Sequence, residues 1–151
     1  MSLASASALT PERSRMLQAV MERLLPGTDG PGAAEAAVAT AVEAAIGHRS
    51  SRGLRAGIEK ALDRLQSQAE TRYAREFPAC APADQDELLR ALERDPSPWI
   101  RFVFRSLIAL SLQGLLGDPV HGGNRECRGW ESIGLRPEDA RSGLCRGAPE
   151  A

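Results

Sequence analysis

The feature that most constrains the fold is an apolar run of eighteen residues, Trp99 to Leu116, which lies between Pro98 and Gly117. Apolar side chains would occupy almost every face of a helix formed by this run, and such a helix is typical of the centre of a bundle. At about 1.5 Å per residue it would reach roughly 27 Å, almost the thickness of a bilayer core. Arg101 and Arg105 lie within it, and each would cost about 2.5–3.5 kcal/mol near the membrane centre. We therefore predict a buried helix of a soluble protein and no membrane span.

Four other segments carry helical signals, whereas the period-2 alternation that indicates strands is nearly absent. The expected helices cover residues 10–25, 33–46, 50–75 and, beginning at Pro82 or at an Asp84–Glu87 capping box, a stretch that ends before Asp95. We predict an all-α fold, a single small bundle of about five helices with a Gly-rich C-terminal loop. The domain is expected to span residues 10–136, between a flexible N-terminus, 1–9, and a flexible tail, 137–151.

Composition excludes several classes of partner. The chain has 19 Lys and Arg against 20 Asp and Glu, so it lacks the basic surface of a nucleic-acid-binding protein. Six aromatic residues are too few for base-stacking platforms. Alanine accounts for 24 residues, and because alanine buries little surface, the apolar fraction overstates the core. We therefore expect a partner surface to complete the burial.

The cysteines and the first residues bear on the compartment. Cys80, Cys127 and Cys145 form no CxxC pair, so free thiols are the favoured interpretation and a Cys127–Cys145 disulfide is the alternative. Residues 1–9 contain no basic region, no strongly apolar stretch and no twin-arginine pair. The expected location is therefore the cytoplasm, or the periplasm if the protein is exported together with a partner.

The segment 117–135 is the most informative part of the chain. It contains five glycines, begins with the turn-forming pair Asp118-Pro119, and includes Gly122-Gly123-Asn124, three residues that tolerate positive φ. Trp130 and Ile133 are expected to anchor the loop on the helices. One interpretation is a surface loop held by a single Trp. The other is a recognition loop that offers backbone amides, His121, Asn124 and Arg125 to a partner.

Catalytic and metal-binding chemistry has little support in the sequence. His48 and His121 are the only histidines, and His121 with Asp118 and Cys127 would make a poor metal site. His48 lies in a polar loop and is expected to be solvated. No Ser or Cys lies in a nucleophile elbow, and Gly122-Gly123 follows no strand and is not a dinucleotide-binding motif. We expect no catalytic residue, no bound cofactor and no metal in this chain.

One family shares the pattern of this segment. The run from Leu112 to Asn124, followed by Gly129-Trp130 and Ile133-Gly134, resembles the gluconate 2-dehydrogenase subunit 3 family. The resemblance also includes Leu9-Thr10-Pro11-Glu12, Leu24-Leu25-Pro26, Arg52-Gly53-Leu54 and residues 82–92, so it covers about residues 9–136. Gln113 stands where the family usually has Glu, and His121 where it has Tyr.

The resemblance implies a non-catalytic small subunit. Its partner would be a large FAD-dependent flavoprotein of the glucose–methanol–choline type, acting on a sugar, polyol or glycoside, and a cytochrome c subunit often completes such complexes. The small subunit would bind, mature and stabilise the large one. The alternative is a transient assembly or export chaperone that is not part of the final enzyme.

We predict that the segment 117–135 docks on the partner. Asp118 would fix the turn, Gly122 and Gly123 would allow close approach of the backbones, and Trp130 would anchor the loop. His121 and Asn124 would offer polar groups to the partner.

Overall fold

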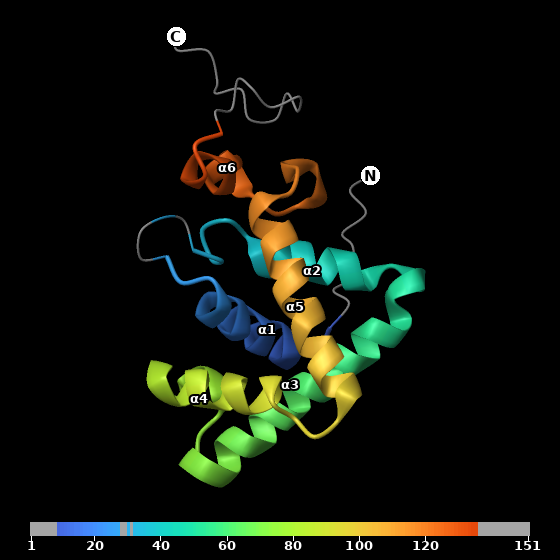
Figure 1. Cartoon of the computed structure of the whole chain (residues 1–151), viewed down its shortest axis with the longest axis vertical. Coiled ribbons are helices and arrows are strands. Elements are labelled where there is room, and N and C mark those ends of the chain that lie inside the picture. Colours follow the sequence, from blue (N-terminus) through green and yellow to red (C-terminus); the bar gives the residue numbers. More distant parts are fainter. Residues whose placement is uncertain (1–8, 28–29, 31, 136–151) are drawn as a thin grey trace.

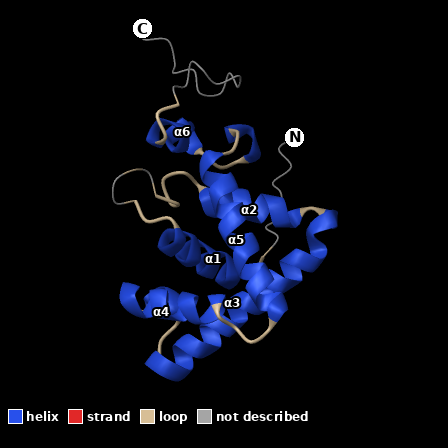
Figure 2. Cartoon of the chain, viewed as in Figure 1, coloured by secondary structure: helices blue, strands red, loops and turns tan. Residues whose placement is uncertain are grey.

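The computed structural model describes residues 9–27, 30 and 32–135, and all regular structure in these residues is helical (Figure 2). This confirms the all-α prediction. The α-helices are α1 (Pro11–Leu24), α2 (Val38–Gly47), α3 (Arg52–Tyr73), α4 (Pro82–Glu93), α5 (Pro98–Leu116) and the short α6 (Arg128–Ser132). Single 3-10 turns lie at Arg49–Ser51, Phe77–Ala79, Pro119–His121 and Arg125–Cys127. The two segments expected to be flexible lie outside the described residues except for Leu9, which is buried in the core.

Helix α5 organises the bundle. It contacts each of the other five α-helices, with α6 at its C-terminal end and α3 and α4 near its N-terminal end (Figure 1). Ile100, Val103, Phe104 and Leu107 enter the core, where they meet the apolar faces of α1 to α4. α5 is also long and apolar enough, by length and composition alone, to cross a membrane. Only a third of this apolar stretch is buried inside the bundle. The expectation of a helix buried on most sides was therefore wrong for one face.

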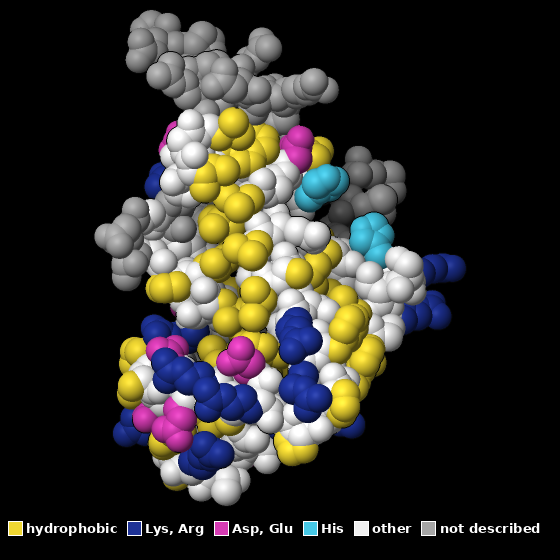
Figure 3. All heavy atoms as spheres, in the orientation of Figure 1, with side chains coloured by type: hydrophobic (Ala, Val, Ile, Leu, Met, Phe, Trp, Pro, Cys, Tyr) yellow, Lys and Arg dark blue, Asp and Glu magenta, His cyan; other side chains and the backbone are white. Residues whose placement is uncertain are grey.

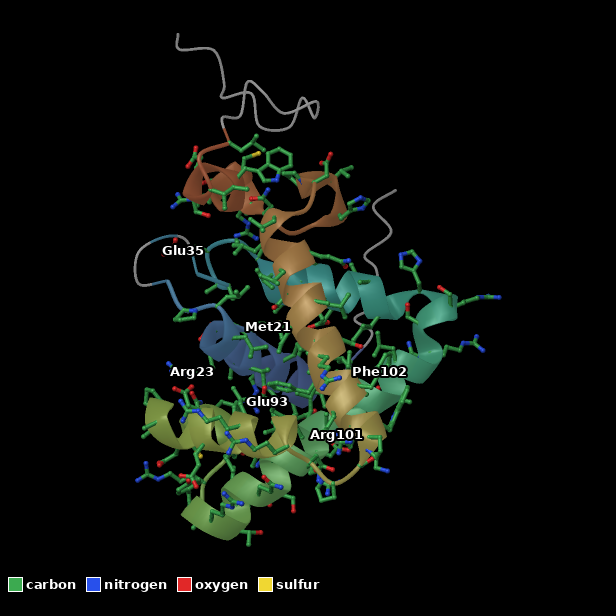
Figure 4. The ribbon with its side chains drawn as sticks, viewed as in Figure 1. Met21, Arg23, Glu35, Glu93, Arg101 and Phe102 are labelled. Carbon is green, nitrogen blue, oxygen red and sulfur yellow. The ribbon has the colours of Figure 1, made fainter. Side chains whose placement is uncertain are left out.

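The first helix begins where its local signals predict. The Thr10 side chain accepts a hydrogen bond from the Arg13 amide, and Pro11 occupies the first turn. Met16, Leu17, Val20 and Met21 form its buried face. Arg23, near the end of α1 and labelled in Figure 4, donates two hydrogen bonds of 2.8 Å to the Asp86 carboxylate of α4. This ion pair ties the first helix to the fourth.

The second helix begins later than predicted. Residues 33–37 form turns, Ala37 has a φ of 54°, and α2 starts only at Val38. Ala33 and Ala36 are buried, and the Ala36 carbonyl accepts a hydrogen bond from the Arg125 amide. Long-range packing therefore overrides the helix propensity of this alanine-rich stretch.

The fourth and fifth helices begin at prolines. Pro82 lies in the first turn of α4 and no side chain caps that helix, so the Asp84–Glu87 capping box was wrong and the Pro82 alternative is correct. Before α5, the Asp95 carboxylate is 3% exposed, accepts the Ser97 amide at 2.9 Å and pairs with Arg64 of α3 at 2.8 Å. These contacts fix the direction in which α5 leaves the turn.

Candidate functional site

The segment 117–135 is a compact cap on the C-terminal end of α5. The Asp118 carboxylate accepts a hydrogen bond from the Val120 amide at 3.0 Å and so fixes the first turn, as predicted for this residue. Gly122 follows with a φ of 91°, a conformation that L side chains rarely adopt. Asn124, Glu126 and Cys127 also have positive φ values, from 45° to 58°. Such backbone is uncommon and persists only where the surrounding structure holds it.

Asn124 is the residue that holds this backbone. Its side chain is fully buried, its amide nitrogen donates to the Gly117 carbonyl at 2.9 Å, and its amide oxygen accepts from the Gly129 amide at 2.8 Å. Its own backbone amide donates to the Gly114 carbonyl at 2.7 Å. One side chain thus connects the beginning of the loop, its end and helix α5. Asn124 supports the loop from inside, so the expectation that it offers its side chain to a partner was wrong.

Two glycines allow the loop to lie against α5. A Cβ atom on Gly123 would collide with the Gly114 carbonyl, and one on Gly129 would collide with the Leu115 carbonyl. Gly123 is buried, so the close backbone approach predicted for this residue occurs within the chain itself. Gly123 packs against α5 while Gly122 is exposed, and no strand precedes the pair among the described residues, so the pair does not fit the loop that cradles a dinucleotide phosphate.

Trp130 holds the end of the loop. Its indole nitrogen donates to the Leu116 carbonyl at 2.6 Å, and the ring is half-buried. This contact confirms the predicted anchoring of the loop. Ile133, the second predicted anchor, is 62% exposed, so that prediction was wrong. The chain turns at Gly134, and the Leu135 amide donates to the Trp130 carbonyl, which directs Ile133 away from the core.

The outer side of the cap adjoins a cavity of about 590 Å³ between α2 and α5. Its floor is mainly alanine and glycine, from Ala41, Ala44 and Ala45 of α2 and Gly114 of α5. His48, Gln113, Asp118 and His121 supply the polar groups of its wall. Both histidines are exposed, as predicted for His48, and Figure 3 shows them on one face of the molecule. An apolar hollow with a few polar groups is suited to receiving a side chain of another protein.

The described cysteines differ in state. Cys127 is fully buried and disulfide-bonded, so the favoured free-thiol interpretation was wrong for this residue. Cys145, the proposed partner, lies outside the described residues. Cys80 is a free, buried thiol, and burial is the main cause that raises its pKa. Among the described residues, no group of three or more His, Cys, Asp or Glu side chains converges on a metal position.

The structure therefore divides the six predicted docking residues into two groups. Asp118 and His121 line the cavity, and Gly122 and His121 are exposed on the loop. Gly123, Asn124 and Trp130 brace the loop from behind. Sequence reasoning missed His48 and Gln113 as neighbours of His121, because the fold joins the end of α2 to the end of α5 across a long separation in the chain.

Comparison with known proteins agrees with this architecture. The family model described as gluconate 2-dehydrogenase subunit 3 matches residues 11–137, which include every described α-helix and the whole cap. No curated protein and no solved structure matches the sequence. Because the family match covers most of the chain, the protein belongs to the gluconate 2-dehydrogenase subunit 3 family, whose name denotes a subunit of a dehydrogenase complex.

Proposed function

We propose that this protein is a non-catalytic small subunit that binds, matures and stabilises a large FAD-dependent dehydrogenase subunit. The large subunit would be of the glucose–methanol–choline type, would hold the FAD, and would act on a sugar, polyol or glycoside. A cytochrome c subunit is a further expected member of the complex. Membership in a family of dehydrogenase subunits supports an accessory role.

The observation that carries this proposal is the rigidly braced cap at the end of α5. Three hydrogen bonds of Asn124 and the indole hydrogen bond of Trp130 hold the backbone in an uncommon conformation. This bracing fixes Val120, which is 65% exposed, and His121 beside the cavity. A preorganised surface binds a partner with a smaller loss of conformational entropy than a flexible loop does. The cap therefore has the properties of a docking element.

The test separates contact with the partner from folding of the cap. The double variant Val120→Ser, His121→Ser replaces two exposed side chains that make no side-chain hydrogen bond among the described residues. The bundle of this variant should therefore fold normally. The variant and the wild type are each co-expressed with the large subunit, and the yield of co-purified flavoprotein is measured by affinity capture and flavin absorbance. We expect the double variant to weaken binding about tenfold, which corresponds to about 1.4 kcal/mol of binding free energy, and so to lower that yield.

Arg75→Ser is the control, because Arg75 is exposed beyond the end of α3, at the opposite end of the bundle from the cap (Figure 1). Equal flavoprotein yields from the double variant and the wild type would count against docking through the cap. If active flavoprotein forms only with co-expression but is purified without this chain, the transient assembly chaperone becomes the better description. Failure of the wild type both to bind the large subunit and to affect its yield would reject both roles.

A further inference from the structure

The exposed large apolar side chains are confined to one part of the chain. Among the described residues there are six, and all of them lie between residues 99 and 135: Trp99, Phe102, Leu112, Val120, Ile133 and Leu135. None comes from α1 to α4. Figure 3 shows the resulting apolar band along α5, with basic side chains beside its lower part. A concentration of exposed apolar side chains on one part of a folded chain marks a surface that another molecule covers.

The part of this band farthest from the cap is an ordered aromatic pair. The rings of Trp99 and Phe102 stack with their centroids 5.4 Å apart, although the side chains are 45% and 54% exposed. Trp99 lies directly on Gly57 of α3, where a Cβ atom would meet the indole ring at 3.1 Å. The aromatic pair is therefore held in place before any partner arrives. Preorganised Trp and Phe side chains are typical of the residues that dominate binding energy in protein interfaces.

Two arginines share this face of α5. Arg101 donates to the backbone carbonyls of Asp95 and Pro96, at 2.7 and 3.2 Å, which fixes its side chain at the start of the helix (Figure 4). Arg105, three residues beyond Phe102 on the same face, is exposed. Among the described residues neither arginine pairs with a carboxylate, and Glu93 of α4 forms no ion pair with them. The face thus combines stacked aromatics with positive charge that the chain itself does not neutralise.

We infer that the exposed face of α5, centred on Trp99, Phe102 and Arg105, is a second docking surface for the large catalytic subunit. The complementary surface is apolar and edged by carboxylates that pair with Arg101 and Arg105. This inference rests on the proposed function and extends it, because the contact then runs from the cap along α5 to its N-terminal end. Leu112, which is 45% exposed, lies on α5 between this face and the cap.

Two other occupants fit the observations less well. A two-fold dimer places the same surface on both sides of the interface, so it would gather the arginines of both copies, four in all, in one interface. A helix that lies on a membrane surface usually separates its apolar face from its charges. Here Arg105 lies within the apolar band, between Phe102 and Leu112. Apolar and aromatic residues combined with Arg are instead enriched in protein–protein interfaces.

The test measures the affinity of the purified chain for the purified large subunit. The variant Phe102→Ser, Arg105→Glu changes two exposed residues, and Arg75→Glu provides the matched charge reversal outside the face. We expect the double variant to raise the dissociation constant by about 30-fold or more, the size that truncating an interface hot spot produces. Arg75→Glu should leave it within about twofold. Circular dichroism and thermal unfolding confirm that each variant is folded.

Salt provides a second readout for the carboxylates of the partner. Binding of the wild type should weaken as ionic strength rises, and Arg105→Gln should reduce that dependence. If the wild type binds the large subunit and the double variant binds equally well, the α5 surface is rejected while the proposed function stands. If the wild type does not bind at all, the proposed function fails first. If the wild type and Arg75→Glu self-associate and the double variant does not, the face belongs to a second copy and the inference is overturned. If the wild type and Arg75→Glu bind anionic phospholipid vesicles and the double variant does not, the face belongs to a membrane and the inference is likewise overturned.

Discussion

At the scale of single residues, Asn124 holds the cap together through three hydrogen bonds. No part of it is exposed, yet three of its polar groups reach the two ends of the loop and helix α5. Its φ of 45° also suits asparagine better than any other residue with a side chain except aspartate. A residue that is selected for a backbone conformation and for two side-chain hydrogen bonds has few replacements.

We predict that Asn124→Ala loosens the cap. The buried Gly129 amide and the Gly117 carbonyl lose their partner, which costs about 1–3 kcal/mol, and alanine is disfavoured at positive φ. Hydrogen exchange measured by NMR should show much faster exchange at the Gly129 amide, with little change in the core of α3. Arg125→Ala, at the exposed neighbouring position, is the control. Unchanged protection of Gly129 would show that Asn124 does not brace the cap.

At the scale of elements, ion pairs connect helices that are distant in sequence, and Arg23–Asp86 is the clearest of them. The hydrogen-bonded Arg23 guanidinium holds the pKa of the Asp86 carboxyl below its ordinary value of 3.8. A carboxyl with a lower pKa in the folded state than in the unfolded state adds stability above its unfolded pKa. That contribution disappears as the pH falls through the folded pKa.

Asp86→Asn should therefore destabilise the protein by about 0.5–1 kcal/mol at pH 7, a size expected for a partly exposed, bidentate pair. The difference from the wild type should shrink as the pH falls below about 4, since the wild-type carboxyl then becomes protonated. Urea unfolding at pH 7, 4 and 3 measures it. Glu87 lies on α4 as Asp86 does, and Glu87→Gln, which disrupts the more exposed pair with Arg72 of α3, should have a smaller effect. A difference that does not decrease at all between pH 7 and pH 3 would have another origin.

Helix boundaries were predictable where the signal is local. Thr10 and Pro11 mark the start of α1, and Ser97 with Pro98 marks that of α5, because a cap acts within three residues. The start of α2 was not predictable, since the turn before it depends on a hydrogen bond from Arg125. The cavity was missed for the same reason, because His48 and His121 become neighbours only when α2 packs on α5.

At the scale of the whole molecule, the two described cysteines should respond differently to alkylation. We expect Cys80 of protein purified without reductant to be protected while the protein is folded and to react with iodoacetamide after denaturation, because the thiol is buried. Cys127 should react only after reduction, because it is disulfide-bonded. Peptide mass analysis before and after reduction distinguishes the two residues. Labelling of Cys127 in the denatured, unreduced protein would contradict the assignment.

The hydrogen bond between the Arg125 amide and the Ala36 carbonyl has a consequence for the order of events during synthesis. Residues 32–37 leave the ribosome well before the loop segment that contains Arg125 and fixes their turn. The cap closes only when the segment through Trp130 has also left the ribosome. A partner that recognises the closed cap would therefore bind poorly to a nascent chain from which this loop has not yet emerged.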